Sequence, residues 1–321
     1  MPIESFLDFS EPVLDVRSPS EYLQGHIPAA ISFPLFSDEE RAGVGTLYKK
    51  KGGQAALKLG LDLVGPKLAS FVEKGEKLAS PSGHFRIYCA RGGMRSSSLH
   101  WLLETAGFRC TRLSGGYKAF RRWTLDQFEK EYQLSVLGGL TGSGKTEKLL
   151  QLEREGEQVL NLEEFASHRG SSFGHLGCAE QPSCEHFENL IAVKLSQFDP
   201  DKTIWIEDES RMIGKCRIPQ GLWGQMSLGK LIWLSCPKEE RIERLSRHYT
   251  HHPEEEMVQA TLKLAKKLGA VKTGQIIEYI QNHHFETAIS TLLDYYDQAY
   301  SYSCQKREKG VGSQETGEIL P

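Results

Sequence analysis

The chain has 321 residues, a formal net charge of −3, and contents of 39% hydrophobic and 25% charged residues. This length is enough for two ordinary domains, and the composition is typical of soluble globular proteins. The sequence has no apolar run of about 18 residues, which excludes a membrane span, and its slightly acidic balance excludes nucleic-acid binding through a generally basic domain.

The N-terminal segment carries Glu4 where a secretory signal would carry basic residues, and it leads directly into a strand-like stretch. The cysteines are odd in number and far apart, so they suggest neither a disulfide framework nor a paired zinc motif. We therefore expect a cytoplasmic protein with reduced thiols. The seven cysteines are Cys89, Cys110, Cys178, Cys184, Cys216, Cys236 and Cys304.

Strand-like and helix-like stretches alternate along the first part of the chain. The stretches VLDVR, AISFP, FRIYC and RCTRL predict strands. Helices are expected from Met94 to Ala106 and from about Tyr117 to Glu131. This alternation predicts an α/β domain with a parallel sheet over residues 1–131.

A second alternation begins with the hydrophobic stretch LSVLGGL and continues with QVLNL, TIWIE and KLIWLSC. A helix is expected from about Lys145 to Arg154, and further helices from Pro237 to about Tyr302. Residues 132–304 are therefore predicted to form a second α/β domain with a helical C-terminal part. The polar residues 305–321 are expected to be a flexible tail.

The segment from Tyr88 to Ser96, YCARGGMRS, lies between a predicted strand and a predicted helix. Such a turn directs backbone N–H groups inward as an anion site. The same groups lower the pKa of a cysteine thiol and make it nucleophilic. The catalytic candidates are Cys89, Arg91 and Arg95, and the loop candidates are Gly92, Gly93 and Met94.

With this loop, the stretches Asp15–Leu35 and Ser114–Phe120 resemble a rhodanese domain, a family that carries sulfur on a cysteine. The spacing of Cys89 and Arg95 also matches the C-x5-R loop of cysteine-dependent phosphatases. Loop length alone leaves chalcogen transfer and phosphate-ester hydrolysis open. Both place a tetrahedral anion beside the thiolate.

The segment GLTGSGKT matches the P-loop pattern G-x-x-x-x-G-K-[ST] between a hydrophobic strand and a helix. Its backbone amides are expected to bind a diphosphate, with Lys145 neutralising charge and Thr146 able to hold Mg²⁺. No dedicated metal site is predicted. The diphosphate-binding candidates are Gly139, Thr141, Gly142, Ser143, Gly144, Lys145 and Thr146.

Two further segments carry candidate residues for this second site. The strand TIWIE ends in Glu207, Asp208 and Glu209, of which any could bind Mg²⁺ or position water. The glycine-punctuated loop HRGSSFG suits a phosphate or an RNA backbone. The anion or RNA candidates are His168, Arg169 and Arg211, and the lysines around Lys263 are a further candidate for contact with RNA.

The motif order extends the resemblance over roughly residues 10 to 300. DEERAGVGTLYKKKG, CARGGMRS, GLTGSGKT, HRGSSFG, FEN and EDESRMIG together resemble the bacterial tRNA 2-selenouridine synthase family. The resemblance implies a rhodanese-like domain fused to a P-loop NTPase-like domain. It implies replacement of sulfur by selenium in wobble 2-thiouridine of tRNA, through an S-geranyl intermediate. The implied co-substrates are selenophosphate and geranyl diphosphate, and the implied partners are this tRNA and a selenophosphate-supplying enzyme.

Two other functions remain open on the residues alone. One is a C-x5-R cysteine phosphatase or a sulfurtransferase fused to a nucleotide-binding P-loop module. The other is a non-catalytic RNA-binding or partner-binding protein with a rhodanese scaffold, against which the presence of Cys89 argues.

Overall fold

A computed structural model describes residues 1–7, 10–310 and 319–320. The chain forms two compact units. The first comprises Met1–Gln127 with Glu185–Ser196, and the second comprises Phe128–Cys184 with Gln197–Pro321. Each unit contains a parallel sheet flanked by helices, which confirms the predicted α/β class. Among the helices of the described residues, none is long and apolar enough to cross a membrane.

The first unit is built on a four-stranded parallel sheet in the order β2-β1-β3-β4. Its strands are β1 (Val13–Asp15), β2 (Ile31–Ser32), β3 (His84–Tyr88) and β4 (Arg109–Arg112). Side chains alternate between the two faces of a strand. Along β3, Phe85 and Ile87 therefore pack into one hydrophobic core, whereas Tyr88 packs into another. Both faces of the sheet are covered, and Cys89 follows directly at the carboxyl end of β3.

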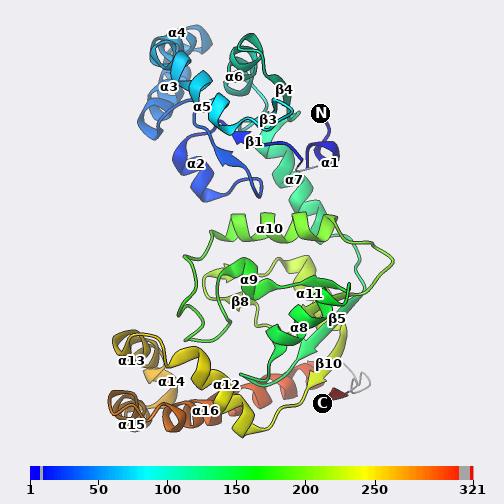
Figure 1. Cartoon of the computed structure of the whole chain (residues 1–321), viewed down its shortest axis with the longest axis vertical. Helices are drawn as coiled ribbons and strands as arrows, with labels where there is room; N and C mark the ends of the chain where they lie inside the picture. Colours follow the sequence, from blue (N-terminus) through cyan, green and yellow to red (C-terminus); the bar gives the residue numbers. More distant parts are fainter. Residues whose placement is uncertain (8–9, 311–318, 321) are drawn as a thin grey trace. The chain divides into compact units, whose positions relative to one another are not determined.

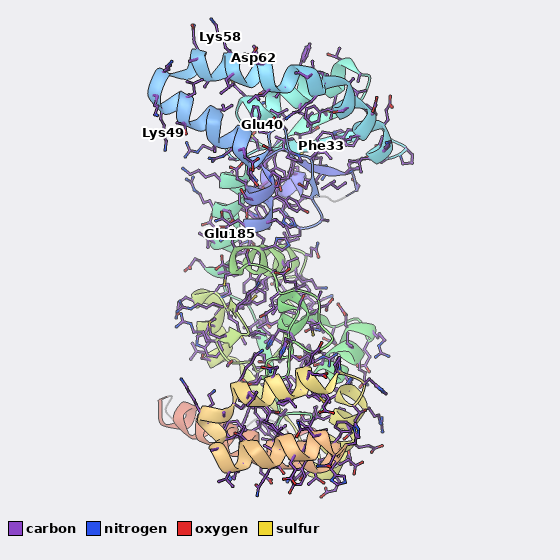
Figure 2. All side chains as sticks on the ribbon, turned by 90° about the vertical axis from the view of Figure 1, so that its left-hand side faces the viewer. Phe33, Glu40, Lys49, Lys58, Asp62 and Glu185 are labelled. Atoms are coloured by element: carbon purple, nitrogen blue, oxygen red, sulfur yellow. The ribbon has the colours of Figure 1, made fainter. Side chains whose placement is uncertain are left out.

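The helices of this unit flank the sheet, and α3 and α4 form a helical hairpin whose Val44, Leu63 and Val64 pack against the core. The helices are α1 (Ile3–Phe6), α2 (Pro19–Gln24), α3 (Asp38–Lys51), α4 (Gly53–Val64), the short 3-10 helix η1 (Gly65–Lys67), α5 (Leu68–Leu78), α6 (Met94–Thr105) and α7 (Gly116–Phe128). A capping box begins α3, in which the Ser37 side chain accepts from the Glu40 N–H. In Figure 2 Lys49 on α3 and Lys58 on α4 point away from the hairpin.

The second unit contains a five-stranded sheet in the order β11-β10-β5-β7-β6. Its strands are β5 (Leu134–Gly138), β6 (Gln158–Leu160), β7 (Ile204–Glu207), β10 (Lys230–Leu234) and β11 (Ile319–Leu320). All neighbouring strands are parallel. The central strand β5 pairs with β7 on one side and β10 on the other. The loop after β5 therefore opens at the carboxyl edge of the sheet, where ligands bind in such folds.

Helices and one small hairpin complete this unit. They are α8 (Lys145–Arg154), α9 (Leu162–Ala166), α11 (Gln220–Leu228) and α12 (Lys238–Tyr249), with the antiparallel pair β8 (Met212–Ile213) and β9 (Cys216–Arg217). The predicted helical C-terminal part follows as α13 (Glu254–Lys263), α14 (Ala265–Leu268), α15 (Ala270–Gln281) and α16 (Phe285–Gly310). Figure 1 shows α12 to α16 gathered together. Their core includes Met257, Ile276 and Leu292.

The helix α16 continues to Gly310, so residues 305–310 of the expected tail are helical in this structure. Residues 311–318 and 321 of that tail lie outside the described residues. Residues 184–196 were predicted to be part of the second domain. In the structure they form the helix α10 (Cys184–Ser196), of which Glu185–Ser196 belong to the first unit.

Candidate functional site

The cysteine loop runs from Cys89 at the end of β3 to Gly93, which caps α6. Cys89 is buried, with 3% of its surface exposed. Its sulfur lies 3.2 Å from the Ser96 hydroxyl oxygen, and Ser96 also bonds to the Gly93 carbonyl at 3.0 Å. The first turn of α6 therefore holds the thiol by a side-chain hydroxyl as well as by the backbone.

The loop favours the thiolate form of Cys89. Burial alone would raise the pKa of the thiol, but the Ser96 hydroxyl, the backbone N–H groups of Arg91 and Ser96, and the charge of Arg95 outweigh burial and lower it. A lowered pKa increases the fraction of the nucleophilic form near neutral pH. The opposite holds for Cys110, where burial raises the pKa to about 12. Among the described cysteines, which are all free, Cys89 is thus suited to chemistry.

Gly116 allows the SGGYKAF segment to approach this loop closely. A Cβ added at Gly116 would lie 2.2 Å from the Cys89 carbonyl oxygen and 2.5 Å from the Gly92 nitrogen. Gly116 also has a φ of +58°, in the left-handed region that favours glycine. The next residue, Tyr117, donates its N–H to the Cys89 carbonyl at 2.8 Å. The start of α7 therefore fixes the position of the cysteine loop.

The two arginines of the loop have different surroundings. Arg95 forms a two-bond ion pair with Glu21 of α2, at 2.6 and 3.3 Å. Burial alone would raise the pKa of Glu21, but its bonds to Arg95 lower it to about 2. Arg91 is exposed, and in the described part of the chain no carboxylate pairs with it. Met94 is exposed as well. Arg91 and Arg95 therefore differ in exposure and in ion pairing.

A buried ion pair lies beneath the sheet end and explains the DVR motif. The Arg17 guanidinium bonds to Asp15 at 2.6 Å and to the Gly25 carbonyl at 2.6 Å. The Tyr88 hydroxyl donates to Asp15 at 2.7 Å, and Arg17 lies 3.7 Å from the centre of the Tyr117 ring. Because both charges are buried and hydrogen-bonded, removing one would leave the other uncompensated. We infer a structural role for this pair.

The FEN motif lies on the part of α10 that belongs to the first unit. The Asn189 amide donates to the His26 carbonyl at 2.8 Å and to the Tyr117 hydroxyl at 2.9 Å. Its oxygen accepts from Arg121 at 2.5 Å, and Arg121 also pairs with Glu188. These bonds attach α10 to the helix that supports the cysteine loop.

The second site is the P-loop between β5 and α8. The Lys145 ammonium donates to the Gly139 carbonyl at 2.9 Å, so it lies back over its own loop. The Ser143 hydroxyl is buried and has no hydrogen-bond partner among the described residues. A Cβ added at Gly139 would lie 2.5 Å from this hydroxyl. A compact turn with an unsatisfied buried donor fits a phosphate group.

A cavity of about 820 Å³ opens above the P-loop. It brings together four cations from separate segments of the second unit, and four acidic residues. Its charged lining residues are Lys145, Arg169, Arg211, Arg244, Glu147, Glu163, Asp208 and Glu209. Of the predicted candidates, Thr141, Gly142, Ser143, Gly144, Lys145, Thr146, Asp208, Glu209, Arg169 and Arg211 all line it.

Three carboxylates lie near one another at the base of this cavity. The Thr146 hydroxyl donates to Glu163 at 3.0 Å, and the Glu163 N–H donates to Glu207 at 2.7 Å. Burial, reinforced by the charge of Glu163, raises the pKa of Glu207 to about 8. Burial and Glu163 also raise the pKa of Glu209 well above its ordinary value. Glu207 is buried behind the cavity, whereas Asp208 and Glu209 line it.

The cavity above the P-loop offers few protein ligands for Mg²⁺. Within the described residues, no group of three or more His, Cys, Asp or Glu side chains is arranged to hold a metal ion. Mg²⁺ in phosphate sites usually keeps several waters and needs only one or two protein ligands. Thr146 and Glu163, joined by a hydrogen bond, fit that requirement. Glu163 was missed by the sequence reasoning because it follows β6 without any recognised motif.

The HRGSSFG loop contributes unequally. The Arg169 N–H bonds to the Gly174 carbonyl at 2.9 Å, which closes the loop, and Arg169 lines the cavity. Gly170 has a φ of +67°, and a Cβ there would lie 2.5 Å from Glu209. His168 is buried, and burial followed by the charges of His175 and Lys263 lowers its pKa. His168 is not among the residues that line the cavity.

Helix α12 provides cavity residues that the sequence reasoning missed. Arg244 donates to the Gly142 carbonyl of the P-loop at 2.7 Å and to Glu147 at 3.1 Å. Arg241 donates to the Thr141 carbonyl at 3.3 Å and pairs with Asp297 of α16. A helix was expected to begin at Pro237, but none of its arginines was named as a candidate site residue. Arg241 and Arg244 are three residues apart, which places them on one face of the helix. This spacing was the feature of the sequence that could have indicated a shared role.

The chain thus consists of a rhodanese-type unit, with a loop cysteine of lowered pKa, and a P-loop unit with a helical C-terminal part. Comparison with known families agrees. Residues 4–122 match the rhodanese-like domain, and residues 132–319 match the tRNA 2-selenouridine synthase AAA domain.

Curated relatives extend this match over most of the chain. A tRNA 2-selenouridine synthase of Pseudomonas putida (strain W619) is 35% identical over 340 residues, which is 92% of this chain and 90% of the relative. That of Hahella chejuensis is 33% identical, covering 94% and 87%. That of Aeromonas salmonicida is 39% identical over 257 residues, covering 77% and 66%. The chain belongs to the tRNA 2-selenouridine synthase family, as the motif order predicted.

Proposed function

We propose that this protein is an enzyme that converts 2-thiouridine at the wobble position of tRNA into 2-selenouridine in two steps. The relatives carry the name of that overall conversion. The observation that carries the proposal is that one chain contains a loop that lowers the pKa of the Cys89 thiol and, separately, a P-loop that opens into a cavity of about 820 Å³. Two anionic co-substrates would require two such sites.

The first step is assigned to the P-loop and uses geranyl diphosphate. The sulfur of 2-thiouridine forms a bond to the first geranyl carbon as the bond from that carbon to the diphosphate oxygen breaks. The base loses its N3 proton, and diphosphate leaves. Lys145, Arg169 and Arg244 would stabilise the negative charge that grows on the leaving group.

Magnesium, if bound at Thr146 and Glu163, would add charge neutralisation to the same leaving group. The carboxyl of Glu207 has its pKa raised to about 8, so it is protonated at neutral pH and adds no negative charge there. This property suits a site that binds a polyanion.

The second step is assigned to the cysteine loop and uses selenophosphate. Selenium forms a bond to C2 of the base while the bond from C2 to the geranylated sulfur breaks, and geranyl thiol leaves. Water takes the phosphoryl group from selenium and releases phosphate. Exposed Arg91 and the loop amides would bind the donor, and Cys89 would position its selenium beside C2 through non-covalent contact.

The bond between Arg95 and Glu21 argues against the phosphatase alternative. A C-x5-R phosphatase needs its arginine over the anion in the loop, but here both Arg95 nitrogens are bonded to Glu21. Turnover of an aryl phosphate that requires Cys89 but no tRNA would favour that alternative.

The experiment is a reconstitution with purified protein and thiolated tRNA, followed by mass spectrometry of the wobble nucleoside. With geranyl diphosphate alone, the product should stop at S-geranyl-2-thiouridine. Addition of selenophosphate should convert it to 2-selenouridine. Formation of 2-selenouridine without geranyl diphosphate would show that the geranylated intermediate is wrong.

A further inference from the structure

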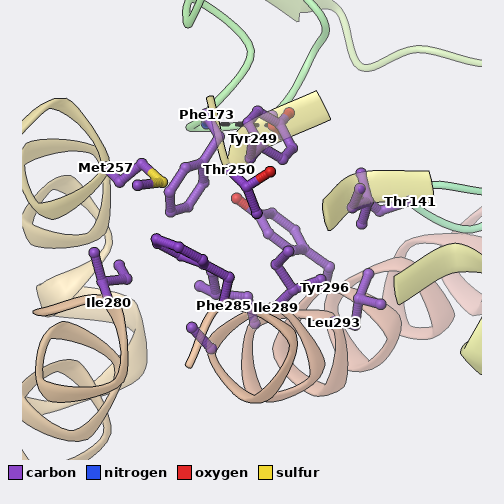
Figure 3. Close-up of a pocket in the computed structure, with 14 residues that line it drawn as sticks. Thr141, Phe173, Tyr249, Thr250, Met257, Ile280, Phe285, Ile289, Leu293 and Tyr296 are labelled. Carbon is purple, nitrogen blue, oxygen red and sulfur yellow. Dashed lines mark hydrogen bonds between the residues drawn. The ribbon is translucent and has the colours of Figure 1, made fainter. Parts of the chain in front are cut away.

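A second cavity lies in the helical C-terminal part of the second unit. It has a volume of about 50 Å³ and is lined by aliphatic and aromatic side chains of α12, α13, α15 and α16 and of the HRGSSFG loop. Figure 3 shows Met257, Phe173 and Phe285 facing one another across it. Among the described residues that line it there is no charged side chain. The cavity is therefore suited to a hydrocarbon group.

This apolar cavity adjoins the cavity above the P-loop. Both are lined by Thr141, Ser171, Leu245, Tyr249 and Tyr296. Thr141 belongs to the P-loop itself, so the phosphate-binding turn forms part of the wall of the hydrocarbon cavity. A ligand that spans both cavities would need a polyanionic head and an apolar tail.

A nucleobase fits the apolar cavity poorly, because its polar edges need hydrogen-bond partners when buried. Nine of the fourteen lining residues are apolar, and the Thr250 hydroxyl already donates to the Ser246 carbonyl at 2.8 Å. An isoprenoid chain makes no such demand. This distinguishes the cavity from the base-binding pocket of an ordinary nucleotide site.

We propose that the apolar cavity receives the far end of the prenyl tail of the diphosphate substrate and limits the tail's length. This inference rests on the proposed function, and it names the residues that select the substrate. The selecting residues are Met257 and Ile280. Figure 3 shows them on the wall of the cavity opposite Thr141.

The size of the cavity sets the expected length. A buried water needs roughly 10–15 Å³ of the same volume measure, so a cavity of about 50 Å³ holds about four water-sized groups. That corresponds to roughly one isoprene unit. The isoprene unit next to the diphosphate would lie along the larger cavity, past Leu245 and Tyr249, and the second would enter the apolar cavity. A third unit would meet Ile280 and Met257.

Calorimetric binding of inorganic diphosphate and of dimethylallyl, geranyl and farnesyl diphosphates to the full chain tests this proposal. Geranyl diphosphate should bind at least about tenfold more tightly than inorganic diphosphate, because its second isoprene unit leaves water. Dimethylallyl diphosphate should gain less, and farnesyl diphosphate should bind more weakly than geranyl diphosphate. Equal affinities for all four would overturn the proposal.

Two variants with a matched control assign the effect to this cavity. Ala288 is buried on α16 and lines the cavity, whereas Thr287 beside it is exposed. Ala288→Leu should fill the space and remove the preference for geranyl diphosphate while inorganic diphosphate still binds. Thr287→Leu should leave both affinities unchanged. An unchanged preference in Ala288→Leu would contradict the assignment.

Ile280→Ala gives the converse test if the filled variant does not fold. It should enlarge the cavity and shift the preference from geranyl towards farnesyl diphosphate, with unchanged binding of inorganic diphosphate as the check on folding. No shift would sink the proposed length limit. If these tail preferences hold but no geranyl group reaches tRNA, the cavity assignment survives and the proposed function fails.

Discussion

The Ser96 hydroxyl lies 3.2 Å from the Cys89 sulfur, in the first turn of the helix that follows the cysteine loop. This contact contributes directly to the lowered pKa of the thiol, against the opposing effect of burial. The reactivity of Cys89 therefore depends on a residue that the catalytic candidates did not include.

Ser96→Ala should raise the pKa of Cys89, because the thiolate loses a hydrogen bond that favours it. The rate of alkylation of Cys89 by iodoacetamide at neutral pH should fall severalfold, and its pH profile should move to higher pH. Ser98→Ala is the control, because Ser98 is exposed and its hydroxyl donates to the Met94 carbonyl of its own helix. A Ser96→Ala profile identical to that of the wild type would contradict the role of this contact.

Gly116→Ala should destabilise the first unit. The new Cβ would lie 2.2 Å from the Cys89 carbonyl oxygen, and relieving this clash would require the backbone to move. The alanine would also have to keep a φ of +58°. We expect a loss of roughly 2–4 kcal/mol in the free energy of unfolding, measured with urea. Gly43→Ala on α3 has open space around it and should not destabilise the protein. Equal stabilities of the two variants would be inconsistent with the close approach described here.

Glu207 should make stability depend on pH. The pKa of this carboxyl rises from 4.5 to about 8 on folding, so the folded state binds the extra proton between these values. The stabilising contribution is complete below the lower value and is lost as pH rises through the higher one. Glu207→Gln should flatten this fall and raise the free energy of unfolding at about pH 9, relative to the wild type, by roughly a few kcal/mol.

Urea unfolding between about pH 5 and pH 9 measures this slope. Glu164→Gln, at an exposed position of α9, is the matched control and should keep the wild-type slope. A Glu207→Gln variant whose stability falls with pH as steeply as the wild type would refute the assignment.

Lys145→Ala should slow transfer of the geranyl group by about 100-fold or more, because the leaving diphosphate loses its nearest cation. Single-turnover formation of S-geranyl-2-thiouridine measures this. Lys148→Ala, at a half-buried position of the same helix that does not line the cavity, controls for loss of one positive charge. If Lys145→Ala transferred geranyl at the wild-type rate, the P-loop would have to serve another ligand.

The sequence predicted the local parts of both sites, because a strand, a glycine-rich turn and a helix follow one another within a few residues. Cys89, Lys145 and Thr146 lie where that order places them. Glu163 and Arg244 escaped prediction, because they reach the P-loop from segments that carry no motif of their own. Their contacts depend on how distant elements pack.

The FEN motif shows the same limit in another way. Asn189 was recognised as part of a family pattern, but nothing in its neighbours along the chain indicates that it bonds to His26 and Tyr117. The apolar cavity was also invisible in the sequence. Its lining comes from several helices, each of which reads as an ordinary amphipathic helix.

The central claim is that the two anion sites divide the work on one nucleobase, and Cys89→Ser tests it most directly. The purified variant would be given thiolated tRNA, geranyl diphosphate and selenophosphate, and the wobble nucleoside would be followed by mass spectrometry. The account predicts that S-geranyl-2-thiouridine forms at the wild-type rate and accumulates, with no 2-selenouridine. Loss of geranylation in this variant, or continued formation of 2-selenouridine, would contradict it.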